Sequence, residues 1–152
     1  MDRDNGRDKD KDRKKVRWLL NPDAALESMF EDTIYEIFWR WSMLFYVLSG
    51  DIQRSRSIIE NTAASMFGNK KLARKAVLKV FSDISAEPAA NIERFIKTSF
   101  YQDCRDKNPS FQHTGRLLDK LWQWRMIAPE DYHRWRHTIK LTLEELSLTG
   151  SP

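Results

Sequence analysis

The chain has 152 residues and a formal net charge of +4; 41% of its residues are hydrophobic, 12% aromatic and 32% charged. This length suits a single domain that buries one hydrophobic core. The low numbers of glycine and proline, 5 of each, argue against a β-sandwich or β-barrel, because these folds need frequent turns. The single cysteine excludes an internal disulfide, a thiolate zinc cluster and a Cys-x-x-Cys redox pair.

The cellular location follows from the same composition. No run of about 18 apolar residues occurs, so we expect no membrane-spanning helix. The first residues are too highly charged for a signal peptide. We therefore predict a protein that is neither secreted nor transmembrane and that acts in a reducing compartment: the cytoplasm, the nucleus or the interior of a host cell.

Residues 1–17 are predicted to form a disordered, charged tail. They hold eight Lys or Arg and five Asp but no aromatic residue, so they bury too little to offset the entropy of ordering. Their basic cluster, Arg13, Lys14, Lys15 and Arg17, has the composition of a phosphate-binding or nuclear-import segment, but solubilising tails look the same. Residues 18–148 are expected to form a single helical domain, followed by a short C-terminal tail over 149–152.

The first predicted helix covers residues 22–49. Asn21-Pro22-Asp23 is a helix-start signal, and Gly50 is the expected C-terminal stop. Apolar residues fill most of the helix circumference and leave one narrow polar stripe, which consists of Ser28, Asp32, Glu36 and Arg40. Glu36 and Arg40 have the order and spacing of an i,i+4 ion pair. A helix that is apolar nearly all round is either central in its bundle or shared with a partner.

Five further helices are predicted from apolar spacing and turn residues. They cover about residues 52–67, 70–82, 88–101 and 114–125, and a last helix starts at Pro129. The stretch 102–112 is the longest predicted loop. Because no segment alternates at the strand period, we predict an all-α fold. It is a compact bundle of five or six helices, with a long central apolar first helix behind the charged tail.

Charge is distributed unevenly between the first two parts of this bundle. Residues 18–51 hold one Arg against six acidic residues, whereas residues 52–82 hold seven Lys or Arg against one Glu. One interpretation is that the two parts pack together and neutralise each other, which is the commoner arrangement. The other is that a basic face is turned outward to a polyanion.

Residues 58–80 resemble a helix-turn-helix pattern. Ala64 and Gly68 have the spacing of the first-helix alanine and the turn glycine, and Val77 stands where the second helix packs inward. Asn69 and Arg74 depart from the pattern. The candidate nucleic-acid-binding residues are the cations on one arc of the second helix: Lys70, Lys71, Arg74, Lys75 and Lys79. Such an arc would neutralise several phosphates in a salt-dependent way.

Catalytic and metal-binding motifs are not found. His133 and His137 are spaced to share a metal ion, but Arg134 and Arg136 flank them and would repel a cation. Cys104 is predicted to lie in a charged loop between Asp103 and Arg105, without an evident orienting acid. No phosphate loop, nucleophile elbow or dinucleotide fingerprint occurs. We therefore predict a protein that is not an enzyme and that has no metal, no cofactor and no small-molecule substrate.

Tryptophan is also unusually frequent, with 6 residues in the chain. Trp39 with Trp41, and Trp122 with Trp124, are Trp-x-Trp pairs whose rings point about 200° apart on a helix. One ring of each pair therefore needs a second layer of the bundle or a partner, and Trp is enriched at interface centres. These four residues are the candidate partner-binding residues. The predicted function is a small adaptor or regulatory protein that acts through protein–protein contacts, with self-association; the alternative is the nucleic-acid-binding regulator.

Overall fold

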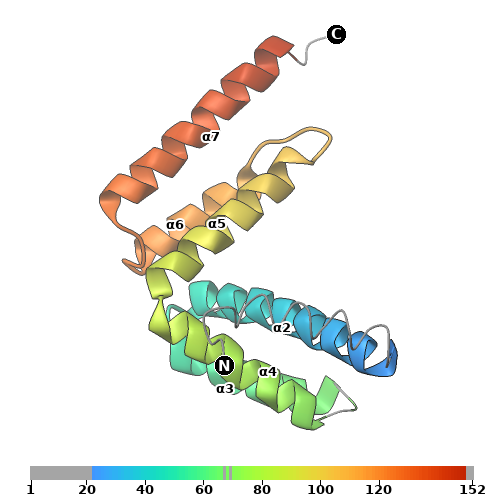
Figure 1. The fold of residues 1–152 in the computed structure, drawn as a ribbon. Helices are drawn as coiled ribbons and strands as arrows, with labels where there is room; N and C mark the ends of the chain where they lie inside the picture. The colour runs from blue at the N-terminus through green and yellow to red at the C-terminus, as the bar shows by residue number, and fades with distance from the viewer. Residues whose placement is uncertain (1–21, 67, 69, 150–152) are drawn as a thin grey trace, which may run out of the picture.

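A computed structural model describes residues 22–66, 68 and 70–149 of the chain. The described residues form six α-helices and no strand, as the sequence predicts (Figure 1). The helices are α2 (Pro22–Ser49), α3 (Ile52–Met66), α4 (Lys70–Ala86), α5 (Pro88–Cys104), α6 (Gln112–Gln123) and α7 (Pro129–Thr149). The predicted tail over residues 1–17 lies outside the described residues, and so does the predicted C-terminal tail apart from Thr149. None of the described helices is both long and apolar enough to cross a membrane.

The helices form two groups that meet at the C-terminal part of α2. Helices α2, α3 and α4 pack on one another, and α5 and α6 pack together and also contact α2 (Figure 1). Helix α7 contacts α6, and its C-terminal end extends away from the other helices. Helix α4 continues to Ala86, four residues beyond the prediction, because the buried Ile84 prolongs its apolar stripe.

The turn between α2 and α3 requires a glycine, which confirms the predicted end of the first helix. Gly50 has a φ of 70° and donates its backbone N–H to the Tyr46 carbonyl over 2.8 Å. A Cβ added at this position would lie 2.5 Å from the ring of Trp124, at the end of α6. The turn is therefore held both by a left-handed backbone and by close packing of a distant indole.

Helix α2 buries side chains over more than half of its circumference. Its fully or nearly buried side chains are Ile34, Phe38, Trp39, Met43 and Val47. Leu44 and Leu48, on another side of the same helix, are 45% and 51% exposed. The predicted apolar circumference depends in part on residues 22–28 and 30, whose side chains lie outside the description.

Trp39 joins α2 to the α4–α5 corner. Its indole Nε1–H donates to Asn91 Oδ1 over 2.8 Å, and the Asn91 amide donates in turn to the Glu87 carbonyl over 2.8 Å. The Tyr35 hydroxyl donates to Asp83 Oδ2 over 2.6 Å. Burial, helped by this hydrogen bond to Asp83, raises the pKa of Tyr35 above its ordinary value. Polar bonds therefore connect α2 both to the C-terminal part of α4 and to the first turn of α5.

Two buried serines at the contact of α2 and α3 provide a test of this packing. Ser55 Oγ donates to the Ser42 carbonyl over 2.8 Å, whereas Ser42 Oγ is buried without a hydrogen-bond partner among the described residues. We expect Ser42→Ala to leave the free energy of unfolding unchanged or to raise it, because it removes an unsatisfied hydroxyl. We expect Ser55→Ala to lower it by about 1 kcal/mol. Urea denaturation measures both values, and the reverse order of the two variants would contradict the arrangement.

Candidate functional site

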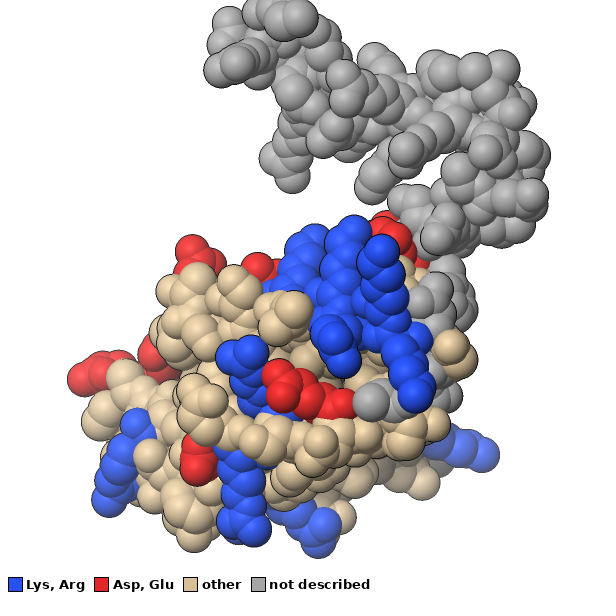
Figure 2. Space-filling model, turned by 90° about the horizontal axis from the view of Figure 1, so that it is seen from below, with Lys and Arg blue, Asp and Glu red and all other residues tan. Residues whose placement is uncertain are grey.

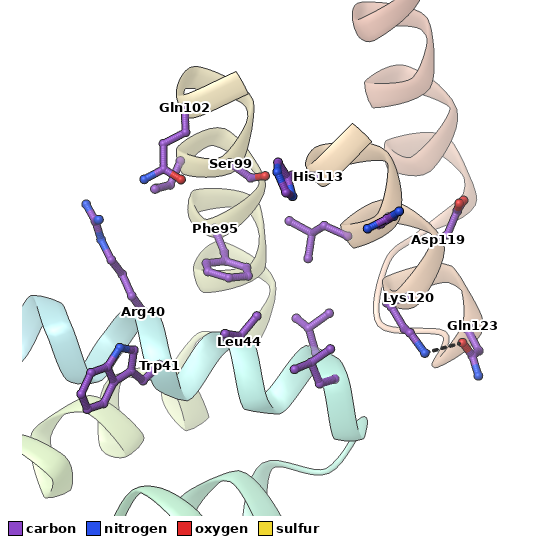
Figure 3. A pocket seen from close by; sticks show the side chains of 15 residues that line it. Arg40, Trp41, Leu44, Phe95, Ser99, Gln102, His113, Asp119, Lys120 and Gln123 are labelled. Carbon is purple, nitrogen blue, oxygen red and sulfur yellow. Dashed lines mark hydrogen bonds between the residues drawn. The ribbon is translucent and has the colours of Figure 1, made fainter. Parts of the chain in front are cut away.

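A groove of about 710 Å³ lies between α2, α5 and α6 (Figure 3). Its apolar wall consists of Trp41, Leu44, Val47, Leu48, Phe95 and Leu117. Its polar lining consists of Arg40, Thr98, Ser99, Gln102, His113, Arg116, Asp119, Lys120 and Gln123. Leu44 and Leu48, the exposed leucines of α2, belong to this groove, so apolar surface stays open to solvent at the place where the two helix groups meet.

The rim of the groove carries cations without carboxylate partners. The predicted Glu36–Arg40 ion pair is not formed, because Glu36 pairs with Arg94 of α5 instead. Arg40 and Arg116 make no ion pair with any described residue, and the ammonium group of Lys120 contacts only the amide oxygen of Gln123, at 3.4 Å. The groove therefore presents three uncompensated positive charges beside an apolar floor.

The one carboxylate in the lining is already engaged elsewhere. Asp119 points toward α7 (Figure 3), where it pairs with Arg136 and accepts a hydrogen bond from the Tyr132 hydroxyl over 3.0 Å. Burial alone would raise the pKa of Asp119, but the hydrogen bonds from Arg136 and Tyr132 outweigh it and hold the pKa below its ordinary value. Asp119 thus stays ionised and committed to α7, and it does not neutralise the rim.

The N-terminus of α6, which carries His113 and Arg116 to the groove, is held by a residue from α5. Phe111, the N-cap position, has a left-handed φ of 56° and makes no side-chain cap. The buried carboxylate of Asp103 takes over this role and accepts the Thr114 backbone N–H over 2.9 Å and the Thr114 hydroxyl over 2.5 Å. Ser99 Oγ lies 3.1 Å from the same hydroxyl and completes the network.

Helix α7 is attached to α5 through Glu93. Arg134 donates to Glu93 Oε1 over 3.0 Å, and the Trp135 indole donates to Oε2 over 3.1 Å. The Trp135 ring also packs against Phe100, with ring centroids 5.6 Å apart. Burial alone would raise the pKa of Glu93, but the hydrogen bonds from Trp135 and Arg134 outweigh it and lower the pKa below its ordinary value of 4.5.

This attachment is expected to weaken in acid. Because the folded state lowers the pKa of Glu93, the stabilisation is complete above about pH 4.5 and is lost as the pH falls through the folded-state pKa. An acid titration followed by tryptophan fluorescence should show this loss of packing at Trp135. Glu93→Gln should remove that step, whereas Glu130→Gln, at an exposed position of α7, should keep it. The same step in Glu93→Gln would contradict the assignment.

The four predicted partner-binding tryptophans do not form one surface. Trp39 is 1% exposed and belongs to the core, whereas Trp41 is half-buried and lines the groove. Trp122 is half-buried against Tyr132, with ring centroids 5.1 Å apart, and Trp124 is exposed at the α2–α3 turn. The bundle thus supplies the second layer for Trp39 and Trp122. Sequence reasoning missed Leu44, Leu48, Arg116 and Lys120, because nothing in their spacing shows which helix will leave them uncovered.

The candidate nucleic-acid-binding cations all lie on the exposed side of α4. Lys70, Lys71, Arg74, Lys75 and Lys79 are exposed, and none of them forms an ion pair with a described residue. Among these five residues, Lys79 alone makes a cation–π contact, in which its Nζ lies 5.3 Å from the centre of the Tyr35 ring. Lys and Arg side chains gather on the α3 and α4 side of the molecule (Figure 2). Neutralisation by the acidic part of α2 is therefore not found among the described side chains.

The helix-turn-helix resemblance is carried by only part of the predicted pattern. Val77 is buried, in the inward position that the pattern predicts. A Cβ added at Gly68 would meet nothing within 4 Å, so close packing does not require glycine at the turn. Ala64 has no described side chain, and Asn69 lies outside the described residues. Helices α3 and α4 contact each other and run in opposite directions (Figure 1).

His133, His137 and Cys104 are the residues whose types suit metal binding or nucleophilic chemistry. Across the described residues, no three His, Cys, Asp or Glu side chains are grouped so that they could hold a metal ion. His133 and His137 are exposed on α7. The predicted loop position of Cys104 is wrong, because α5 continues three residues beyond the predicted end and includes Cys104. Burial, with a contribution from the charge of Asp103, raises the pKa of its thiol and so disfavours the thiolate.

No protein family, curated protein or solved structure matches this chain in the comparisons with known proteins.

Proposed function

We propose that the protein is a small, non-enzymatic adaptor that binds an amphipathic helix of a protein partner in the groove between α2, α5 and α6. The observation that carries this proposal is an open apolar groove floored by Leu44 and Leu48, which together leave about half of their side-chain surface in water. Apolar surface that gathers in a concave site is typical of helix-in-groove recognition, in which the apolar face of the ligand helix fills the groove.

The charge of the rim defines the kind of helix that fits. Arg40, Arg116 and Lys120 have no carboxylate partner among the described residues, so they are available to acidic side chains at the edges of a bound helix. Opposite charges around an apolar contact steer association and select against basic partners. The ligand is therefore a helix with a leucine-rich ridge and acidic flanks.

This function also gives α2 the role that its sequence suggests. A long helix with too little polar surface for one side is satisfied when one face enters its own core and another enters a partner. Phe38 and Met43 are buried in the core from two sides of the helix, and Leu44 and Leu48 lie on the side that the groove leaves open. In this proposal α2 is the central helix shared between the bundle and its partner.

Two synthetic helical peptides test the proposal. Both carry the same leucine ridge; in one the ridge is flanked by Glu and in the other by Lys. Fluorescence anisotropy should show that the Glu-flanked peptide binds at least about tenfold more tightly, a difference of about 1.4 kcal/mol. Leu44→Glu or Leu48→Glu should abolish this binding.

Leu78 provides the matched control for these variants. It is 49% exposed, like the groove leucines, but lies on α4. Leu78→Glu should therefore bind the Glu-flanked peptide as the unchanged protein does. Equal binding of the two peptides, or unchanged binding by Leu48→Glu, would contradict the proposal, and binding of small apolar compounds without either peptide would point to a small-molecule site.

Binding of nucleic acid by α4 is the second candidate function, and the outward-facing cations favour it. Lys71→Glu, Arg74→Glu and Lys75→Glu together should abolish retardation of duplex DNA at low salt, where electrostatic binding is strongest, without loss of helicity. A control variant with the same charge change elsewhere, Lys97→Glu with Arg105→Glu and Lys107→Glu, should keep most of the binding. Equal losses in the two variants would show a general charge effect and would contradict a site on α4.

A further inference from the structure

Helix α7 has apolar residues on two opposite faces. Trp135 and Ile139 are buried, and Leu143 packs against the core from the same side. Leu141 and Leu148 lie about 180–200° around the helix from Ile139 and about 20° from each other. They are 48% and 83% exposed, so they form a second apolar ridge that the described chain leaves uncovered. We call Leu141 and Leu148 the α7 ridge.

Acidic residues flank this ridge on both sides. Glu144 and Glu145 lie about 50° to either side of the line through Leu141 and Leu148. Both are exposed, and neither forms an ion pair with a described residue. The C-terminal half of α7 therefore has the two properties that the groove requires of its ligand: a leucine ridge, and a carboxylate on each edge.

The ridge is not directed toward the groove of its own chain. The groove lies between α2, α5 and α6. The C-terminal end of α7 extends away from α2 (Figure 1). The contacts of Glu93 with Arg134 and Trp135 hold the first half of α7 on α5. These contacts would have to break before α7 could reach the groove of its own chain. A second molecule meets no such restriction.

We infer that the groove binds the α7 ridge of a second copy of this chain. The inference rests on the proposed function and identifies its partner. Leu141 and Leu148 enter the groove against Leu44 and Leu48, while Glu144 and Glu145 face the rim cations, Arg40, Arg116 and Lys120. The basis is charge complementarity: three cations and two carboxylates, all unpaired among the described residues, flank apolar surfaces of matching kind.

Reciprocal exchange makes the assembly a closed dimer. Each copy offers one ridge and one groove, so two copies related by a two-fold axis satisfy both. An exchange in one direction only would leave a free ridge at one end and a free groove at the other, and would continue into a chain of molecules. We therefore expect a dimer in which α7 of each molecule lies across its partner.

Sedimentation velocity on the full chain tests the contact. The unchanged protein should sediment as a dimer, and Leu48→Glu in the groove or Leu148→Glu in the ridge should each give a monomer. Both positions are at least half exposed, so circular dichroism should show unchanged helicity. Leu78→Glu, the equally exposed control on α4, should remain dimeric.

Charge exchange tests which groups face each other. The pair Arg116→Glu and Lys120→Glu should raise the dimer Kd at least about tenfold, and so should the pair Glu144→Lys and Glu145→Lys, because each places like charges at the contact. All four substitutions in one chain should restore most of the affinity. No rescue in the fourfold variant would overturn the pairing of these groups.

The remaining outcomes separate this inference from the proposed function. A protein that stays monomeric at its highest soluble concentration, yet binds the Glu-flanked peptide, overturns the inference and leaves the groove as a site for another protein. Dimers that survive Leu48→Glu but not Leu148→Glu show ridge-to-ridge pairing and also overturn it. If the protein neither dimerises nor binds the Glu-flanked peptide, both proposals are overturned.

Discussion

Replacement of Trp39 by alanine is expected to lower the free energy of unfolding by about 3–5 kcal/mol, the usual cost of removing a large buried aromatic side chain. Trp39 is almost fully buried and contacts α5. Its ring packs edge-on against the Phe95 ring, with ring centroids 5.9 Å apart, and the guanidinium of Arg94 lies 4.1 Å from the centre of the Trp39 ring. Loss of the ring opens a cavity where the two helix groups meet.

Denaturant unfolding with two further variants separates the causes. Trp39→Phe keeps an aromatic ring but removes the N–H that bonds to Asn91, and should cost about 1–3 kcal/mol because a partly buried acceptor loses its donor. Leu78→Ala, at an exposed position of α4 outside the groove and the α7 ridge, should change stability by less than about 0.5 kcal/mol. A cost for Trp39→Ala as small as that for Leu78→Ala would show that Trp39 is not part of the core.

Asp103→Ala is expected to lower the free energy of unfolding by about 2–3 kcal/mol. The Asp103 carboxylate is the only described cap for the N-terminus of α6, where it accepts the backbone N–H and the hydroxyl of Thr114. Its removal leaves the buried Thr114 N–H without an acceptor and leaves the Thr114 hydroxyl only Ser99 Oγ as a partner. A cap next to the positive end of the helix dipole is lost as well.

The same variant should also weaken the groove. Because His113 and Arg116 follow directly from the first turn of α6, fraying of this turn should raise the Kd for the Glu-flanked peptide. Asp103→Asn, which keeps one acceptor oxygen, should cost less than Asp103→Ala in thermal unfolding. Asp106→Ala, at an exposed neighbouring position, should leave stability and peptide binding nearly unchanged. Equal stability of Asp103→Ala and Asp106→Ala would contradict the capping role.

Local signals in the sequence were sufficient for the helices. Pro22, Pro88 and Pro129 begin helices as predicted, and Gly50 ends one, because these residues restrict or free the local backbone. Helix α6 begins at Gln112, two residues before its predicted start at Thr114. Its first turn is held by Asp103 from another helix, and no local pattern announces such a cap.

Side-chain partners were less predictable than helices. Glu36 and Arg40 have ideal spacing for an ion pair, yet Glu36 turns to Arg94, 58 residues away along the chain. The predicted mutual neutralisation of acidic and basic helices likewise depends on which faces meet, and the cations of α4 face outward among the described residues. Helix spacing places a residue on a face but does not say what covers that face.

The amino-acid sequence alone determined that this protein is helical, where most of its helices begin, and which residues are basic, because these properties depend on neighbours within one or two turns. The tertiary structure decided that Trp39 is core, that Leu44 and Leu48 stay open, and that Arg40, Arg116 and Lys120 surround them. These properties depend on how α2, α5 and α6 cross, and that crossing is set by contacts between residues far apart in the chain.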